Sequence, residues 1–316
     1  MHPATTPLTL ATALSSWRLD VSSAVAILLI GGFYLWGTRV QRRRGVTVAA
    51  APLWCFGIGC SLWALATMSM IGVYAGVLFW VRALQVLTLL FLVPFFLAMG
   101  RPLTLLRDVL TAQGRARLDA VLAGPAARVV AHPVSTSIAM LGTPWLLYLT
   151  PWYRTALESA PVGAATNAAL VLIGFGYFYA RLQTDPVPRR YSQLISVVIS
   201  IVETIGDGLL GLVLWLGPVI AVGYYDGLQR TWGPSQRLDQ TIGAGVLWIL
   251  GDVLGVPFLI MLMHGLSVDE RARSVEVDAA LDDEESARAD PQPEAATSRL
   301  WWEDDPQLRD RFNRLS

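Results

Sequence analysis

Apolar residues along the chain gather in long runs that contain almost no charged positions. A helix needs about 20 such residues to cross the hydrocarbon core of a bilayer, and seven runs come close to or exceed that length. They cover residues 21–40, 50–73, 76–100, 134–153, 163–182, 194–224 and 241–266. The sixth run is long enough to tilt in the bilayer, or to break near Gly217 and Pro218. The pattern therefore predicts an all-α, polytopic membrane helix bundle of about seven transmembrane helices.

Arginine residues give this bundle a predicted orientation. With the N-terminus outside, the inner loops hold twelve arginines and the outer segments hold four. The inner set is Arg39, Arg42, Arg43, Arg44, Arg101, Arg107, Arg115, Arg117, Arg128, Arg181, Arg189 and Arg190; the outer set is Arg18, Arg154, Arg230 and Arg237. Because basic loops are retained in the cytoplasm, we predict that the N-terminus is outside and the C-terminus inside. The first run lacks a basic stretch before it, so we expect an uncleaved first helix.

These boundaries divide the chain into three predicted parts. Residues 1–20 form an outer N-terminal segment, residues 21–266 form the seven-helix membrane domain, and residues 267–316 form a cytoplasmic tail. Within the domain, residues 101–133 form an inner loop whose leucines recur at helical spacing, which indicates an amphipathic helix on the membrane surface. The tail has fourteen acidic residues against seven arginines, so we expect it to be largely disordered, with its Trp301-Trp302 end either unstructured or a short docking helix.

Composition excludes several classes of function. Hydrophobic residues make up 54% of the chain, and the formal net charge is zero. No Walker loop, dinucleotide fingerprint, HExxH or GxSxG motif is present, so the sequence predicts no enzyme. We expect membrane lipid around the protein and no nucleic-acid partner.

Four ionisable residues fall inside the predicted membrane helices: Arg82, Glu203, Asp207 and Asp252. Charged groups are costly in hydrocarbon, so each is a candidate functional residue, together with Gln85 one turn from Arg82. Arg82 and Asp207 lie at similar predicted depth, which favours an ion pair between the third and sixth helices, shared with Glu203. A proton or ion pathway, or a Glu203 that is protonated and hydrogen-bonded, are alternative interpretations.

Candidate metal ligands are few. Met68 and Met70 form a Met-Ser-Met sequence at the predicted outer end of the second helix, and thioethers suit Cu(I). Methionine fills gaps in apolar cores more commonly than it binds copper. The three histidines do not face one another at ligand spacing, and Cys55 and Cys60 are interpreted as buried apolar residues. The sequence therefore predicts no metal site and no cofactor, with Met68 and Met70 as weak candidates.

The order of several short segments resembles the CtaG family of cytochrome c oxidase assembly factors over roughly residues 17–273. Matching segments include Tyr34-Leu35-Trp36-Gly37, Tyr74-Ala75-Gly76-Val77-Leu78-Phe79, Gly100-Arg101-Pro102-Leu103-Thr104-Leu105, Pro151-Trp152-Tyr153, and Leu238-Asp239-Gln240-Thr241-Ile242-Gly243-Ala244-Gly245 with Trp248. The resemblance implies a seven-helix membrane protein associated with copper-site maturation. It also makes Tyr153, Asp239, Gln240 and Trp248 family-motif positions.

The departures from that family concern its copper ligands. The family's third helix usually carries His-Met-x-x-His, and the two histidine positions are here Arg82 and Val86, while Gln85 between them is kept. Leu149 takes the place of another family histidine. An arginine cannot ligate copper, and a fixed cation repels it, so we expect no copper to bind there.

The leading hypothesis is a membrane assembly or accessory factor for respiratory cytochrome c oxidase in the bacterial plasma membrane. It would act by protein–protein contacts with oxidase subunits or other assembly factors. One alternative is a proton- or ion-coupled transporter that uses Arg82, Glu203, Asp207 and Asp252. A second alternative is a copper chaperone that uses Met68 and Met70.

Overall fold

A computed structural model describes residues 6–182 and 193–253, together with the single positions 255, 256, 260, 263, 267 and 274. The chain separates into two units, Met1–Leu266 and Ser267–Ser316. The predicted domain boundaries stay predictions. The predicted disorder of the tail lies outside the described residues.

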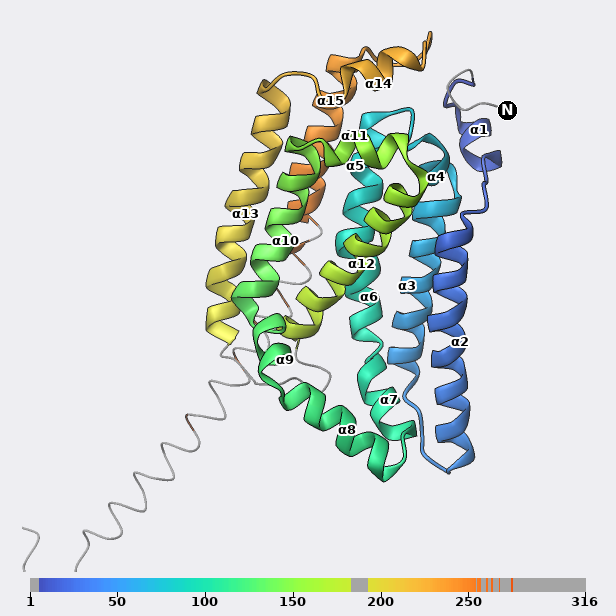
Figure 1. The fold of residues 1–316 in the computed structure, drawn as a ribbon, viewed down its shortest axis with the longest axis vertical. Helices are drawn as coiled ribbons and strands as arrows, with labels where there is room; N and C mark the ends of the chain where they lie inside the picture. Colours follow the sequence, from blue (N-terminus) through green and yellow to red (C-terminus); the bar gives the residue numbers. More distant parts are fainter. Residues whose placement is uncertain are drawn as a thin grey trace, which may run out of the picture. The chain divides into compact units, whose positions relative to one another are not determined.

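The described part of the first unit is helical and contains no strand (Figure 1). Its helices in chain order are α1 (Leu10–Ser15), α2 (Val21–Arg43), α3 (Ala50–Met68), α4 (Met70–Tyr74), α5 (Phe79–Leu87), η1 (Thr88–Leu92), α6 (Val93–Met99), α7 (Pro102–Val109), α8 (Ala112–Ala123), α9 (Pro125–Val130), α10 (Pro133–Leu149), α11 (Trp152–Glu158), α12 (Ala160–Leu182), α13 (Gln193–Leu216), α14 (Val222–Gly227), α15 (Gln236–Gly245) and η2 (Val246–Leu250). The segments η1 and η2 are π-helical.

The described residues of the seven apolar runs are mainly helical, which confirms the predicted all-α membrane bundle. Within the described residues, five helical segments are long and apolar enough to cross a membrane, namely Val21–Arg43, Ala50–Tyr74, Phe79–Met99, Ala160–Leu182 and Ile199–Leu216. The fourth run is α10, which has 17 residues. The seventh begins as α15, continues through η2 into residues 251–253, and then passes largely outside the described residues.

Of the two alternatives for the sixth run, a tilted helix or a break near Gly217 and Pro218, the structure has the break. Helix α13 ends at Leu216, directly before Gly217 and Pro218. Proline has no backbone N–H to donate and disfavours helical conformation in the residue before it. The remainder of the run leaves the axis of α13 and enters the short helix α14.

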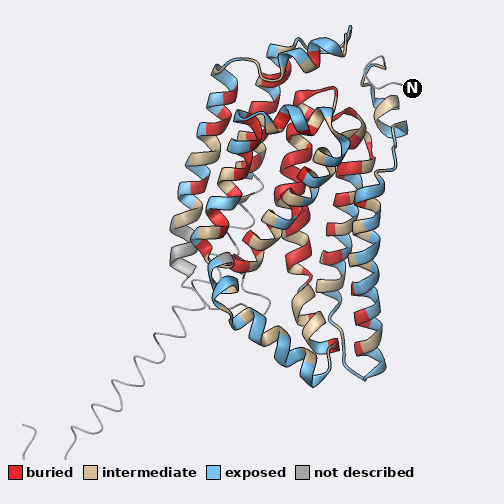
Figure 2. Ribbon diagram, in the orientation of Figure 1, coloured by how far each residue is buried: buried red, intermediate tan, exposed pale blue. Residues whose placement is uncertain are grey.

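The helix that runs from α5 through η1 to α6 forms the centre of the bundle (Figure 2). In its most apolar stretch 72% of the residues are buried, compared with 22% for α2 and for the end of α13. Helix α12 crosses it closely at Gly174, where a Cβ atom would lie 2.1 Å from the carbonyl oxygen of Leu90. Glycine permits such close backbone approach between membrane helices.

The inner loop is helical, as predicted, and consists of α7, α8 and α9. Two hydrogen bonds connect the loop to the end of α2. Gln41 donates to the Asp108 carboxylate at 2.8 Å, and Arg44 donates to the Asp108 carbonyl at 2.9 Å. Figure 1 shows α8 and α9 at the opposite end of the bundle from α11 and α14. The position of this loop on the membrane surface stays a prediction.

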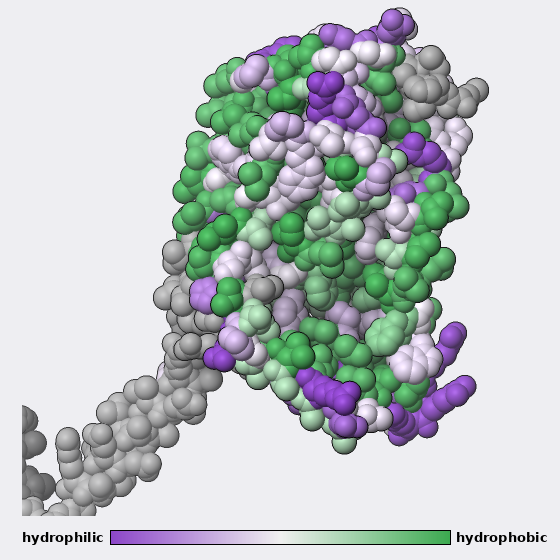
Figure 3. All heavy atoms as spheres, viewed as in Figure 1, coloured by the Kyte–Doolittle hydropathy of each residue, from purple (hydrophilic) through white to green (hydrophobic). Residues whose placement is uncertain are grey.

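The outer flanks of the bundle carry apolar side chains. Leu28 and Leu29 of α2, Leu172 of α12 and Ile249 of η2 are all more than half exposed. Figure 3 shows broad apolar areas on one face, with strongly hydrophilic patches near its two ends. Exposed apolar surface of this extent fits contact with lipid.

Candidate functional site

Arg82 lies on α5 within a buried polar cluster that joins three helices. Its Nη1 donates to Oε1 of Gln85 at 2.5 Å and to Oδ1 of Asn167 on α12 at 3.3 Å. The Gln85 amide donates in turn to the Ala66 carbonyl of α3 at 2.8 Å. The sequence therefore identified Arg82 and Gln85 as neighbours, but it did not identify Asn167.

The predicted ion pair between Arg82 and Asp207 is wrong. Within residues 6–182 and 193–253, Arg82 has no carboxylate partner, although its side chain is only 6% exposed. Its Nε and Nη2 atoms are buried and have no hydrogen-bond partner in the described structure. Similar depth along two helices does not fix the direction that each side chain faces, and the Arg82 guanidinium contacts Asn167 of α12.

Asp239, a family-motif position, caps the start of α5. Its Oδ2 accepts a hydrogen bond from the Phe79 amide and its Oδ1 accepts one from the Trp80 amide, both at 3.0 Å. Amides in the first turn of a helix have no partner within that helix, so this carboxylate satisfies two of them from α15. The Arg230 guanidinium lies 3.5 Å away. Burial raises the pKa of Asp239 above its ordinary value, against the lowering effect of the two amides and Arg230.

Gln240, the next residue, performs the matching role at the end of α13. Its Nε2 donates to the carbonyls of Leu214 at 2.8 Å and Pro218 at 3.0 Å, and its Oε1 accepts from the Ile220 amide at 2.8 Å. The break at Gly217 and Pro218 leaves these backbone groups without helical partners. Gln240 thus satisfies the polar backbone that the broken helix exposes.

The other two motif positions also have packing roles. The Tyr153 hydroxyl lies 2.7 Å from the Tyr225 hydroxyl, which connects α11 to α14. Trp248 packs against α13, where a Cβ atom added at Gly211 would lie 2.8 Å from the Cβ of Trp248. All four motif positions therefore hold the helices together at the predicted outer end or beside α13.

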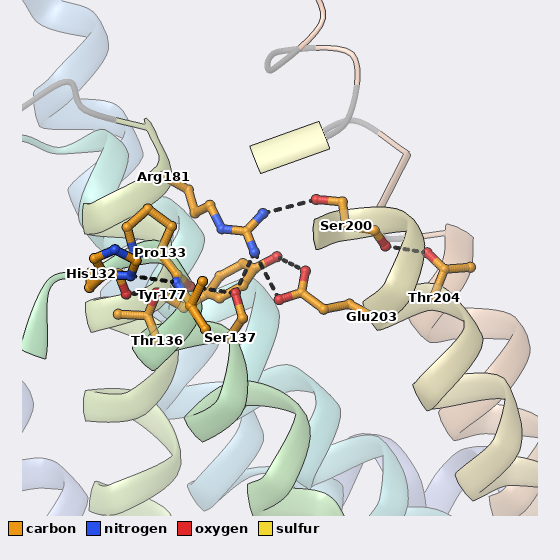
Figure 4. Close-up of polar contacts among 10 residues, drawn as sticks. His132, Pro133, Thr136, Ser137, Tyr177, Arg181, Ser200, Glu203 and Thr204 are labelled. Atoms are coloured by element: carbon orange, nitrogen blue, oxygen red, sulfur yellow. Dashed lines mark hydrogen bonds and ion pairs between the residues drawn. The ribbon is translucent and has the colours of Figure 1, made fainter. Parts of the chain in front are cut away.

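A second buried cluster centres on Arg181 and Glu203 (Figure 4). Arg181 is 0% exposed, and its Nη2 lies 2.9 Å from Oε1 of Glu203. The same nitrogen donates to the Ser137 hydroxyl at 2.5 Å, and Nη1 donates to the Ser200 hydroxyl at 3.0 Å. The Tyr177 hydroxyl donates to Oε2 of Glu203 at 2.7 Å. The cluster therefore joins α10, α12 and α13 through one buried ion pair.

Arg181 is the functional candidate that the sequence analysis missed. It was assigned to an inner loop, whereas it lies in the last turn of α12 and points into the bundle. Tyr177 lies one turn earlier, and the Arg181 guanidinium carbon is 4.7 Å from the centre of its ring. The available signal was the position of Arg181 inside the fifth apolar run, one helical turn after a tyrosine.

The predicted acidic residues meet at one cavity of about 400 Å³. Glu203, Asp207 and Asp252 all line it, whereas Arg82 and Gln85 do not. The predicted polar network is therefore divided between two places: three carboxylates share the cavity, and Arg82 with Gln85 forms the separate cluster on α5.

Met68 and Met70 flank Ser69 at the junction of α3 and α4. The Ser69 hydroxyl donates to the Leu65 carbonyl at 2.5 Å and accepts from the Ile71 amide at 3.3 Å, which ends one helix and begins the next. Among the described residues, no group of three or more histidine, cysteine, aspartate or glutamate side chains could hold a metal ion. Copper binding through the two thioethers is not tested by this finding.

The sequence model of one protein family matches residues 32–267, and that family is described as cytochrome c oxidase caa3 assembly factor, Caa3_CtaG. The chain belongs to the Caa3_CtaG family. The match covers most of the bundle and includes the two caps formed by Asp239 and Gln240.

Curated relatives of this Caa3_CtaG protein come from mycobacteria. It is 24% identical over 269 residues to Uncharacterized protein Mb0105 of Mycobacterium bovis and to Uncharacterized protein MT0111 of Mycobacterium tuberculosis, in each case over 81% of this chain and 40% of the relative. It is 24% identical over 255 residues to Uncharacterized protein ML1998 of Mycobacterium leprae, over 78% of this chain and 39% of the relative. The chain thus aligns with less than half the length of these relatives. No solved structure matches it significantly.

Proposed function

We propose that the chain is a membrane assembly factor for a cytochrome c oxidase. It acts by binding oxidase subunits or other assembly factors within the bacterial plasma membrane. The observation that carries this proposal is the family match over residues 32–267. The same match supports assembly over the transporter and copper-chaperone alternatives. The mycobacterial origin of the relatives and the five membrane-capable helices support the location.

The proposed role does not use a copper site on α5. By the resemblance to the family, Arg82 and Val86 occupy positions that are usually histidines. The guanidinium of Arg82 is held there by Gln85 and Asn167, and it is buried. A buried cation at this place opposes the binding of a second cation because the local dielectric constant is low. A protein with this arginine can still assist assembly through protein contacts, but it does not transfer copper from this position.

Copper content after purification tests the absence of a metal site. The expected result is well below one copper per chain, and Met68→Leu with Met70→Leu should change nothing. The double variant Arg82→His with Val86→His restores the family's residues at one face of α5 and should gain copper. Stoichiometric copper in the unaltered protein that is lost in the Met68→Leu, Met70→Leu variant would instead support a copper chaperone.

Cross-linking in native membranes tests the partner. A photoreactive residue at the exposed, lipid-facing position Leu28 or Leu172 should capture an oxidase subunit or another oxidase assembly protein, identified by mass spectrometry. The matched control is a photoreactive residue at Leu90, which is 1% exposed and packs inside the bundle, and which should yield only intramolecular products. Products at Leu28 and Leu172 that contain lipid and no protein of the oxidase pathway would contradict the proposed mode of action.

A further inference from the structure

The cavity that Glu203, Asp207 and Asp252 share is large enough for an organic ligand. Its volume of about 400 Å³ falls within the range of about 300–1,000 Å³ that is typical of small-molecule sites. Five helical segments contribute to its walls, because it lies between α6 with η1, α10, α12, α13 and the helix that follows η2. It therefore lies among five helical segments, and the exposed lining residues Ile201 and Val256 show that it opens at the side of the bundle.

Aromatic rings form much of the apolar wall. Phe91, Phe95 and Phe178 line the cavity, and the Phe178 ring packs edge-on against both others, with centroids 6.4 Å from Phe91 and 5.3 Å from Phe95. These edge-to-face contacts fix the rings in place. Such a wall accommodates an apolar chain, and ring faces also attract an organic cation.

The lining of the cavity holds three acidic side chains and, among the described residues, no basic one. Glu203 is matched by Arg181 at 2.9 Å. Asp207 and Asp252 form no ion pair among the described residues, whose remaining ion pairs are Arg107–Asp119, Arg154–Glu158 and Arg230–Asp239. Asp252 has a side-chain hydrogen bond with Trp248. Both residues are only partly buried, Asp207 more than Asp252, and burial of a carboxylate without a cation is costly to the extent that it is buried. The lining thus leaves two carboxylates beside an aromatic, apolar space.

We propose that this cavity binds a hydrophobic ligand with one protonated amine. The ammonium group lies between Asp207 and Asp252, where its three N–H donors match the carboxylate oxygens. The hydrocarbon part of the ligand lies against Phe91, Phe95 and Phe178. A fatty acid would place a third unmatched negative charge in the cavity, and a neutral alcohol would leave both carboxylates without a cation. The inference does not depend on the proposed role in oxidase assembly.

Binding of decylamine to the purified protein in a non-ionic detergent at pH 7 tests the proposal. Decanol and decanoate serve as ligands with the same chain length and a different head group. Titration calorimetry and the shift of the thermal unfolding midpoint are the two readouts. We expect saturable decylamine binding at least tenfold tighter than that of decanol, and no binding of decanoate.

Two sets of variants locate the site. Asp207→Asn with Asp252→Asn should weaken decylamine binding at least tenfold, whereas Glu158→Gln with Asp226→Asn, which removes two exposed carboxylates outside the cavity, should leave it unchanged. Gly255→Leu should also block binding, because Gly255 lines the cavity and a Cβ added there meets no atom of the described residues within 4 Å. Gly32→Leu on α2 has equally open space and is its matched control.

Each of the other outcomes overturns the proposal. Equal decylamine binding in the Asp207→Asn, Asp252→Asn variant and the unaltered protein would show adsorption outside the cavity. Equal affinity for decanol and decylamine would show that the charge of the ammonium group does not contribute to binding. If Asp207→Asn with Asp252→Asn alters only the pH dependence of unfolding and no amine binds to the unaltered protein, the carboxylates hold protons and not an amine. The helical content by circular dichroism confirms that each variant is folded, and Gly255→Leu tests the site with both carboxylates kept.

Discussion

Arg181 and Glu203 form an ion pair at 2.9 Å that joins α12 to α13, with the arginine fully buried. Ser137 of α10 and Ser200 of α13 also accept hydrogen bonds from the guanidinium. One arginine thus connects three helices of the bundle at the end that we predict to face the cytoplasm. Its dense set of partners contrasts with Arg82, which has two amide oxygens and no carboxylate.

Removal of one partner of the Arg181–Glu203 pair should destabilise the protein strongly. Arg181→Met leaves the Glu203 carboxylate buried without a cation, which typically costs about 3–5 kcal/mol. The double variant Arg181→Met with Glu203→Leu should recover most of this loss, as measured by unfolding in detergent. The exposed pair Arg154–Glu158 is the control, and Arg154→Ala should cost below about 1 kcal/mol. A double variant as unstable as the sum of its single variants would contradict the structural role of the pair.

Replacement of Arg82 should have a much smaller effect. Arg82→Met removes a buried cation that has no counter-charge, which favours the variant, and leaves the acceptor oxygens of Gln85 and Asn167 without a donor, which disfavours it. These effects are each about 1–3 kcal/mol, so we expect a net change below about 2 kcal/mol in the free energy of unfolding. A loss as large as that of Arg181→Met, measured in the same detergent, would indicate a counter-ion for Arg82.

The cap that Asp239 provides should contribute to the stability of the outer end. Asp239→Ala leaves the amides of Phe79 and Trp80 without their acceptor, and loss of a helix cap costs about 0.5–2 kcal/mol. Hydrogen exchange should rise in the first turn of α5 and stay unchanged in α12. Asp226→Ala, at an exposed position on α14, is the matched control. Unchanged exchange at Phe79 and Trp80 would show that the cap is dispensable.

The predicted orientation can be tested with a reporter enzyme that is active only in the cytoplasm. Inserted within α8 it should be active, because this helix belongs to the arginine-rich inner loop. Inserted at Gly233, between α14 and α15, it should be silent. Activity at Gly233 together with silence within α8 would reverse the orientation.

Much of the fold could be predicted from the sequence because the bilayer imposes a simple rule. Every backbone polar group in hydrocarbon needs an internal partner, so a long apolar run becomes a helix. The break after Leu216 was predictable for a similar local reason, since Pro218 cannot continue the helix. Both predictions depend on residues that are adjacent in the chain.

The polar contacts of the site could not be predicted in the same way. The depth of Arg82 and Asp207 along their helices is a one-dimensional estimate, and it does not reveal which neighbour each side chain faces. Both clusters include a residue of α12. Asn167 is 85 residues from its partner Arg82 in the sequence, and Arg181 is 22 residues from its partner Glu203. Such pairings depend on how the helices pack against one another, and no local pattern in a single sequence shows that packing.

The level of assembled cytochrome c oxidase in a strain without this protein tests the central claim most directly. Membranes of the deletion strain should show reduced oxidase activity and a reduced haem–copper centre signal in optical difference spectra. Expression of the chain, or of its Met68→Leu, Met70→Leu variant, should restore both, since the proposed role uses protein contacts and no copper on those methionines. Oxidase activity and spectra that equal those of the parent strain would contradict the assembly function.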